Sequence, residues 1–295
     1  MVWSDEFDQN QLDLDKWNYQ IGTGSEYGLW GWGNGESQYY KPENIYIEDG
    51  ILIIEARSEN YMNSNYTSAR INTKNKGDWL YGKFVARMRL PNAGGTWPAF
   101  WMLPSGGSWP CDGEIDIMEQ WGNDGPTNQT TGAAHLGNGC QGSSTYQSWS
   151  SSISESYADD FHIYSIIWYE NYIGWYVDGD LKYFITPESF SSEFEWPFNQ
   201  DSWYLILNLA ITNSGTNNNT IFRGSVNIKY GNQTIDSETL SFNFEDNLIE
   251  ILDNVYYVNK NTKINADKVE IDLLNKKSKI SMINKNNKVS VTSKY

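Results

Sequence analysis

The chain has 295 residues, a formal net charge of −16 and a sequence pI of about 4.5. That charge argues against nucleic acid as a partner, because its phosphates would be repelled, and it suits a neutral substrate. No run of about 20 apolar residues occurs, so the sequence predicts no membrane-spanning helix. With 14 Trp residues, more than one core easily accommodates, we expect some Trp side chains at a functional surface.

Short runs of β-branched and aromatic residues follow one another along the chain, separated by clusters of Gly, Asn, Asp and Pro. They predict strands at 45–49, 51–56, 67–73, 79–90, 97–103, 113–119, 130–136, 161–169, 172–178, 180–185, 203–210 and 251–258. A hairpin turn is predicted at Asp178-Gly179, and the only helix at 187–194. Many strands with so few helices favour an all-β sandwich or barrel.

The composition changes towards the C-terminus. Residues 212–250 contain the stretch T-N-S-G-T-N-N-N-T and are predicted to be a loop-rich insertion. Residues 259–295 carry nine Lys and three acidic residues in an alternating pattern, which predicts a small basic β-rich extension. The extension could be a solvated addition or a module that binds a cell wall or polysaccharide. We therefore expect a main domain over 1–258 and an extension over 259–295.

Two cysteines, Cys111 and Cys140, lie on either side of the predicted strand 113–119. Two cysteines and two histidines scattered along the chain do not have the spacing of a zinc site. We favour a disulfide that ties this strand to the following loop, and two unpaired buried thiols are the alternative.

The strand G-E-I-D-I-M-E-Q contains three acidic residues, Glu114, Asp116 and Glu119. On a helix, Glu114 and Glu119 would point about 140° apart. On a strand, Glu114 and Asp116 share one face, and a β-bulge around Ile117 and Met118 would return Glu119 to that same face. The sequence therefore predicts a bulged strand that directs all three carboxyl groups to one side.

Three neighbouring carboxyl groups permit glycoside hydrolysis by a nucleophile and an acid/base. Like-charge repulsion from Asp116 would raise the proton affinity of its neighbours. An ordinary half-exposed strand and a calcium-binding cluster are the alternatives. Four Trp residues favour a saccharide site, because indole rings stack on the C–H faces of sugars: Trp97, Trp101, Trp109 and Trp121. Each of these alone could equally be a core residue.

The segment W-P-C-D-G-E-I-D-I-M-E resembles the active-site strand of glycoside hydrolase family 16, in the bulged form found in laminarinases. The segments G-W-G-N-G-E-S-Q-Y-Y, Y-T-S-A-R-I, G-K-F-V-A-R-M-R-L-P, T-W-P-A-F-W-M-L-P and W-Y-V-D-G agree with it. The resemblance runs from Trp3 to Ala210. It implies a β-jelly-roll sandwich of two antiparallel sheets, of the concanavalin A-like type, with a cleft on the concave face, and a retaining mechanism.

By position, the resemblance implies that Glu114 is the nucleophile, Asp116 the assisting acid and Glu119 the acid/base. Polar sugar contacts are implied for Asn34 and Arg70, on the donor side, and for His135, near the leaving group. The alternatives are a surface salt bridge for Arg70 and a hydrogen-bonded strand histidine for His135. Trp97 and Trp101 would form the floor of the cleft.

No cofactor is expected for catalysis. Many members of the family bind a structural calcium ion, and Glu6, Gly50 and Asp253 match the places of its ligands. We expect a secreted monomer that acts on polysaccharide.

Two departures from the family pattern affect the expected specificity. After L-N-L-A the chain continues with I-T-N-S-G-T-N-N-N, which lacks the usual Trp-containing loop, and 251–258 is the best counterpart of the closing strand. The leading interpretation is an endo-acting β-1,3-glucanase. The alternatives are a β-1,3-1,4-glucanase, a transglycosylase, an agarase or carrageenase, a non-catalytic glucan-binding protein and an adhesion module.

Overall fold

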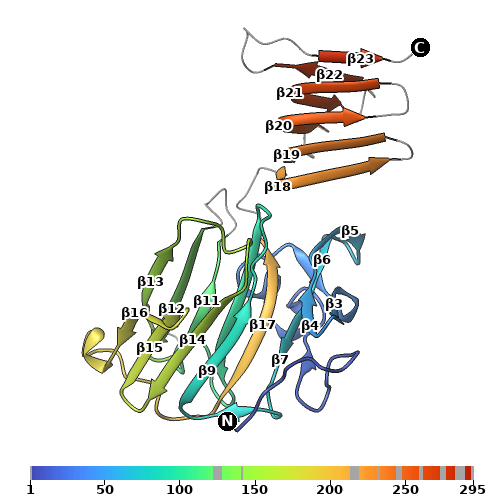
Figure 1. Cartoon of the computed structure of the whole chain (residues 1–295). Helices are drawn as coiled ribbons and strands as arrows, with labels where there is room; N and C mark the ends of the chain where they lie inside the picture. The colour runs from blue at the N-terminus through green and yellow to red at the C-terminus, as the bar shows by residue number, and fades with distance from the viewer. Residues whose placement is uncertain are drawn as a thin grey trace. The chain divides into compact units, whose positions relative to one another are not determined.

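The structure is a computed structural model of the whole chain. It describes residues 2–121, 128–140, 142–212, 219–230, 233–243, 248–258, 262–272, 277–282 and 290–293. The residues fall into two compact units (Figure 1). Unit 1 comprises Met1–Pro91 and Thr96–Asn213, and unit 2 comprises Asn92–Gly95 and Ser214–Tyr295. Among the described residues, no helix is long and apolar enough to cross a membrane.

Unit 1 is a sandwich of two antiparallel sheets (Figure 1). The larger sheet, which we call the front sheet, has the order β1 (Asn18–Tyr19), β7 (Arg70–Asn72), β17 (Trp203–Ile211), β10 (Thr96–Pro104), β11 (Glu114–Glu119), β12 (Gln129–Gly137) and β13 (Ser144–Ser152), with β8 (Asp78–Trp79) paired to β17. The back sheet has the order β16 (Asp180–Ile185), β15 (Tyr172–Val177), β14 (His162–Tyr169) and β9 (Gly82–Met88). This is the jelly-roll architecture that the family resemblance implied.

The core lies between the two sheets, and strand alternation explains how it forms. In β14, Tyr164, Ile166 and Trp168 are fully buried, whereas Ile163 and Tyr169, at the two ends of this run, are exposed. Such alternation is what a strand with one face on a core requires. The front sheet contributes Ile115, Ile117 and Met118 of β11 to the same core. The other face of the front sheet, which we call the open face, is left for function.

Short elements connect β1 to β7. They are β2 (Gln38–Tyr40), β3 (Ile45–Glu48), β4 (Ile51–Ile54), β5 (Arg57–Tyr61) and β6 (Ser64–Ser68), with the 3₁₀ turns η1 (Ser25–Tyr27), η2 (Trp30–Gly33) and η3 (Pro42–Asn44). The predicted hairpin is confirmed, because Asp178 and Gly179 both have positive φ between paired β15 and β16.

The predicted helix 187–194 is wrong. Only the 3₁₀ turn η4 (Pro187–Ser189) forms, and the chain is extended again at Phe190. Phe190 then packs against the core of unit 1, which an extended chain allows.

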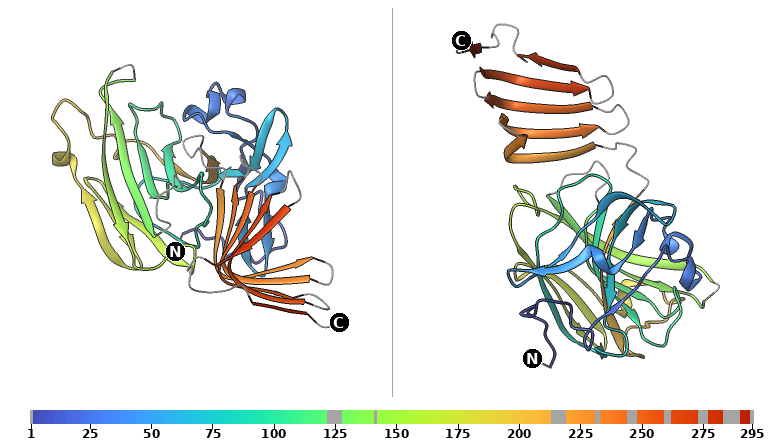
Figure 2. Two further views of the ribbon diagram at one scale, coloured as in Figure 1. Left: turned by 90° about the horizontal axis from the view of Figure 1, so that it is seen from above. Right: turned by 90° about the vertical axis from the view of Figure 1, so that its right-hand side faces the viewer.

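Unit 2 is an antiparallel sheet of long strands (Figure 2). Its order is β18 (Asn219–Tyr230), β19 (Gln233–Asn243), β20 (Leu248–Val258), β21 (Thr262–Asp272) and β22 (Lys277–Ser281), and β23 (Ser290–Ser293) also pairs with β21. Neighbouring strands change register at bulges near their middles, which bends such strands. Among the side chains of this sheet that the structure describes, the buried apolar ones are Ile251, Val255, Ala266 and Val269.

Two expectations about this part of the chain are wrong. Residues 219–230 and 233–243 form two long strands rather than a loop-rich insertion. Despite the many Asn, Ser and Thr residues, apolar residues recur there at alternate positions, as at Val226, Ile228 and Tyr230 and at Leu240 and Phe242. Strand 251–258 does not close the sandwich, since β20 pairs with β19 and β21. Residues 213–218, the core of the loop that departs from the family pattern, lie outside the described residues.

Candidate active site

Strand β11 contains the predicted bulge. Asp116 pairs with Ala133 and Glu119 with Thr131, so Ile117 and Met118 together oppose the single residue Gly132. Both of these bulge residues turn into the core and are about 1% exposed. Because the bulge accommodates one extra residue, Glu119 lies on the open face together with Glu114 and Asp116.

Gly132 is the partner that this bulge requires. A Cβ atom at Gly132 would lie 2.8 Å from the Asp116 carbonyl oxygen and 2.6 Å from Nε1 of Trp149. The same carbonyl accepts a hydrogen bond of 2.8 Å from Nε1 of buried Trp175. The indoles of Trp149 and Trp175 thus hold the backbone of the acidic strand in place. No side chain fits at Gly132, the position opposite the bulge.

The three carboxyl groups form one cluster with His135 of β12. The Asp116 Oδ2 atom lies 3.1 Å from His135 Nε2, and the Glu114 Oε1 atom lies 3.9 Å from it. Asp116 also shares a hydrogen bond with Glu114. Asp116 has a side chain that is only 5% exposed, whereas those of Glu114 and His135 are 20% and 27% exposed. The buried acid thus supports two groups that a ligand can reach.

Burial raises the pKa of Glu114 well above its usual range, and the charges of Asp116 and Glu119 raise it further. His135 and Arg70 oppose this shift. Burial and the charge of Glu119 also raise the pKa of Asp116, and burial raises that of Glu119. Because each carboxylate disfavours ionisation of the others, the cluster holds protons at a pH at which isolated carboxyl groups are ionised.

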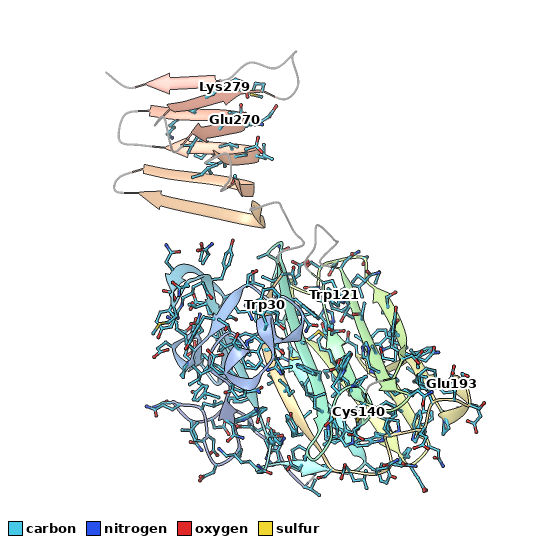
Figure 3. The ribbon with its side chains drawn as sticks, turned by 180° about the vertical axis from the view of Figure 1, so that it is seen from behind. Trp30, Trp121, Cys140, Glu193, Glu270 and Lys279 are labelled. Carbon is cyan, nitrogen blue, oxygen red and sulfur yellow. A yellow bond between two sulfur atoms is a disulfide. The ribbon has the colours of Figure 1, made fainter. Side chains whose placement is uncertain are left out.

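Trp97 of β10 orients Glu119. Its Nε1 donates a hydrogen bond of 2.7 Å to Glu119 Oε1, which lowers the pKa of that carboxyl group and partly offsets burial. The ring of Trp97 stacks on that of Trp121, with centroids 4.0 Å apart and planes inclined by 26°. Trp121 is exposed and can be located in Figure 3. The two indoles and Glu119 therefore form one rigid group.

Arg70 of β7 is held between two aromatic rings. Its guanidinium carbon lies 4.6 Å from the ring centroid of Trp32 and 4.8 Å from that of Trp101. Its Nε donates a hydrogen bond of 2.7 Å to Gln20 Oε1. Arg70 is buried, so it is not a residue of a surface salt bridge. Its positive charge favours the ionised form of Glu114.

A buried polar network continues from Trp101 and was missed by sequence reasoning. Trp101 Nε1 donates to Asn208 Oδ1 at 2.7 Å, and Asn208 Nδ2 donates to the hydroxyl of Tyr40 at 3.2 Å. That hydroxyl donates to Glu36 at 2.8 Å, and Gln38 Nε2 donates to the same carboxylate. A polar residue in the apolar stretch L-I-L-N-L-A was the available signal for Asn208.

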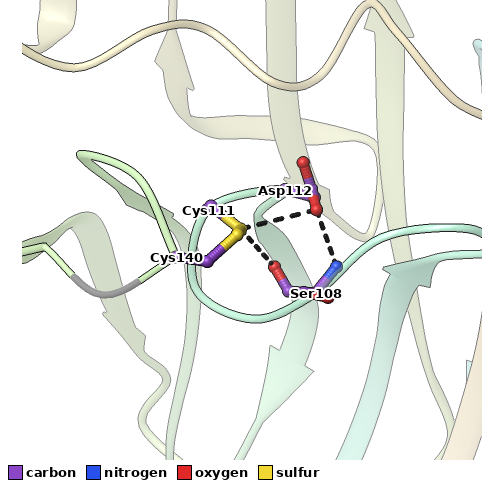
Figure 4. The surroundings of a disulfide bond; sticks show 4 residues. All are labelled: Ser108, Cys111, Asp112 and Cys140. Carbon is purple, nitrogen blue, oxygen red and sulfur yellow. Dashed lines mark hydrogen bonds between the residues drawn. A yellow bond between two sulfur atoms is a disulfide. The ribbon is translucent and has the colours of Figure 1, made fainter.

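The structure joins Cys111 and Cys140 by a disulfide (Figure 4). Ser108 N donates a hydrogen bond of 2.7 Å to Asp112 Oδ2 and closes the turn beside it. This turn carries Trp109, which is 58% exposed and makes no described contact with the three acidic residues.

Asn34 follows η2 and is exposed, with a described hydrogen bond only from its backbone to Gly31. Of the expected sugar-contacting residues, the structure thus brings Arg70, Trp97, Trp101, Trp121 and His135 to the site, whereas Asn34 and Trp109 make no described contact with the acidic residues.

The expected calcium ligands do not form a set within one unit. Glu6 and Gly50 lie exposed in unit 1, whereas Asp253 lies in β20 of unit 2 and its side chain is outside the described ones. In the described part of the chain, Glu6 belongs to no group of three metal-ligating side chains. One such group is Glu114, Asp116 and His135, and the other includes the two disulfide cysteines.

The family model for glycosyl hydrolases family 16 matches residues 33–232. The chain belongs to glycoside hydrolase family 16. It is 41% identical over 224 residues to a β-glucanase of Rhodothermus marinus, covering 72% of this chain and 75% of that protein. It is 36% identical over 248 residues to glucan endo-1,3-β-glucosidase A1 of Niallia circulans, covering 72% of this chain but only 33% of that protein's length.

A solved structure agrees with this assignment. The endo-β-1,3-glucanase of Pyrococcus furiosus superimposes with a TM-score of 0.65 at 38% identity, over 71% of this chain and 83% of that one. The matched share corresponds in size to unit 1, which contains all three acidic residues.

Proposed function

We propose that this chain is a retaining endo-β-1,3-glucanase that hydrolyses laminarin-like β-glucan on the open face of the front sheet. The observation that carries the proposal is the bulge in β11, which sets Glu114 and Glu119 on one face with buried Asp116 between them. Relatives named as β-1,3-glucanases support the linkage.

In the first step, ionised Glu114 attacks the anomeric carbon while protonated Glu119 gives its proton to the departing glycosidic oxygen. The sugar–oxygen bond breaks as the glycosyl–Glu114 ester forms. In the second step, Glu119 removes a proton from water, and the resulting hydroxide displaces Glu114. The proton that left Glu119 is thereby restored, and the configuration at the anomeric carbon is retained.

Each neighbouring group supports one protonation state. Arg70 favours the ionised form of Glu114, which the attack requires. Burial favours the protonated form of Glu119, which the first proton transfer requires. Asp116, hydrogen-bonded to Glu114, can take up proton density as Glu114 changes from a carboxylate to an ester and back.

Reducing-end release from laminarin, mixed-linkage barley glucan and agarose tests the proposal. Wild type should cleave laminarin, and Glu114→Gln should lose activity by about 10⁴-fold or more, because a covalent step is removed. Glu48→Gln, an exposed acid in β3, is the matched control and should retain full activity. Barley glucan reports on tolerance of mixed linkages. Binding of laminarin without cleavage by wild type would instead favour a glucan-binding protein.

Proton NMR identifies which anomer of the product forms first, and this tests the retaining step separately. The β-anomer is expected, and initial release of the α-anomer would contradict the nucleophilic role of Glu114.

We further propose that the chain acts outside the cell as a monomer. The disulfide between Cys111 and Cys140 supports this location, because such bonds persist in oxidising compartments. A structural calcium ion rests only on the family resemblance at Glu6 and Gly50. Unchanged thermal unfolding on addition of EDTA would contradict it.

We place the limit of the catalytic domain near Asn213, where the two units divide, with unit 2 as an accessory module. A chain ending at Asn213 should hydrolyse soluble laminarin at a rate within about twofold of the whole chain. Loss of its folded structure would show that unit 2 belongs to the catalytic domain.

A further inference from the structure

Tyr146 lies in β13, the edge strand of the front sheet, and no role has been assigned to it so far. In the register of the sheet, Glu114 is paired with His135, and His135 is paired with Tyr146. Residues paired directly across antiparallel strands share a face. Tyr146 therefore extends the row of Glu114 and His135 across the open face.

The Tyr146 ring packs on one side and is free on the other. Its centroid lies 5.3 Å from that of His135, with the planes inclined by 30°, and the residue is still 61% exposed. The other residues on this face of β13 are all serines: Ser144, Ser148, Ser150 and Ser152. A large ring stands alone among small polar groups, which is a poor arrangement for packing but a good one for a ligand.

The turn that carries Trp109 bounds the same end of the open face. Gly137 lies two residues after His135 on the same face, and a Cβ atom there would lie 2.9 Å from Cγ of Pro110. The disulfide from Cys111 to Cys140 fixes this turn to the end of β12. Pro110 thus covers the position next to the row of His135 and Tyr146.

The position of Tyr146 relative to the acidic residues indicates which sugars it would meet. Arg70 and Trp101 lie in β7 and β10, on one side of β11, and Tyr146 lies two strands away on the other side. At about 4.8 Å per strand, this places it about 10 Å from the acidic strand. If Arg70 contacts the donor sugars, a chain crossing the strands runs over His135 and then Tyr146 on its acceptor side.

We propose that Tyr146 is the stacking platform of an acceptor-side subsite, which binds a glucose unit of the β-glucan beyond the bond that is cleaved. The exposed ring face takes the C–H face of the sugar, and His135 holds the ring from the other side. The inference rests on the proposed function, since the ligand is the polymer hydrolysed at Glu114 and Glu119. It assigns to Tyr146 a preference for substrates that extend past the leaving oxygen.

The test compares two substrates in the full-length enzyme. Laminarin occupies both sides of the acidic residues, whereas an aryl β-laminaribioside places its two sugars on the donor side and ends at its leaving group. Wild type, Tyr146→Ser, Tyr146→Phe and Tyr146→Trp are assayed for kcat/KM on both. Serine already occupies the neighbouring positions of β13, so Tyr146→Ser should fold, and its Tm is measured as a check. Ser148→Ala is the matched control on the same face.

We expect Tyr146→Ser to lower kcat/KM on laminarin by about 3- to 10-fold, the worth of one aromatic stacking contact. The aryl substrate should change by less than twofold, its pH profile should not move, and the Phe and Trp variants should retain activity on laminarin. An unchanged rate of Tyr146→Ser on laminarin would overturn the inference.

An equal loss on both substrates, or a shifted pH profile on the aryl substrate, would overturn it in a different way. Tyr146 would then act by positioning His135 and not by binding sugar. If wild type cleaves neither substrate, the proposed function itself has failed, and this result is seen before any variant is compared.

Discussion

The two halves of the open face, on either side of β11, are built differently. On the half formed by β7, β17 and β10, buried Arg70 and Asn208 are linked through half-buried Trp101 by a ring contact and a hydrogen bond. On the half formed by β12 and β13, His135 and Tyr146 lie among exposed serines. The first half is preorganised at the cost of burying polar groups, and the second keeps its side chains accessible. This asymmetry suits the proposed mechanism, in which the donor side of the polymer stays bound through two chemical steps and the acceptor side leaves between them.

The strongest test of this comparison is Arg70→Ala. Without the guanidinium, the Glu114 pKa should rise further, so the acid limb of the kcat/KM profile should move to higher pH. We expect a loss in kcat/KM of about 10- to 100-fold, the worth of a charge-assisted contact. Arg70→Lys keeps the charge but not the planar stack, and should recover part of the shift. A profile that does not move in the Ala variant would show that Arg70 has no electrostatic role.

A smaller effect is expected from Trp97→Phe. The substitution keeps an aromatic ring but removes the hydrogen bond that lowers the pKa of Glu119. The basic limb of the profile should therefore move to higher pH, and kcat should fall by about 10-fold through loss of one charge-assisted hydrogen bond. Trp121→Phe is the control, because it disturbs the ring stack but not the bond. Equal pH profiles of Trp97→Phe and Trp121→Phe would show that the stacking of the two indoles, and not the hydrogen bond, sets the pKa of Glu119.

At β11, between the two halves, we expect a substitution that abolishes activity to raise the stability of the protein. The folded-state pKa of Glu114 is raised, so the folded protein binds more protons than the unfolded one between the two pKa values, and stability falls as pH rises through this window. Glu114→Gln should thus raise Tm at pH 7 by about 2–4 °C for each kcal/mol of relief. Near pH 3.5 the two proteins should melt together. A lower Tm of the variant at pH 7 would contradict the unfavourable ionisation of Glu114 in this cluster.

The smallest effect is expected on the half formed by β12 and β13. Ser148→Ala removes an exposed hydroxyl with no described partner, and kcat/KM on laminarin should stay within about twofold. A loss as large as that of Trp97→Phe would mean that this half is also preorganised, and the comparison would fail.

How far the sequence predicted this site depends on the kind of signal each residue gives. The acidic residues and the bulge could be predicted, because Glu119 follows Asp116 by three residues, and strand periodicity then requires a bulge to bring both to one face. Asn208 and Tyr40 could not, since their hydrogen bonds join segments that are 168 residues apart. Tyr146 was missed because β13 consists mostly of serine, which has no strong preference for strands. The division of the chain near residue 213 depends on which strands pair, and residue patterns do not reveal pairing.

The bulge also affects how this enzyme can be altered. Ile117 and Met118 are adjacent, and both point into the core, so exchanging either for another apolar residue changes packing and leaves the acidic residues in place. Deleting one of them would instead remove the bulge and leave a regular alternation, in which Glu119 still falls on the open face. The shared face of the three acidic residues thus has two solutions, a longer strand with a bulge or a shorter strand without one, and a library of substitutions alone would never sample the second.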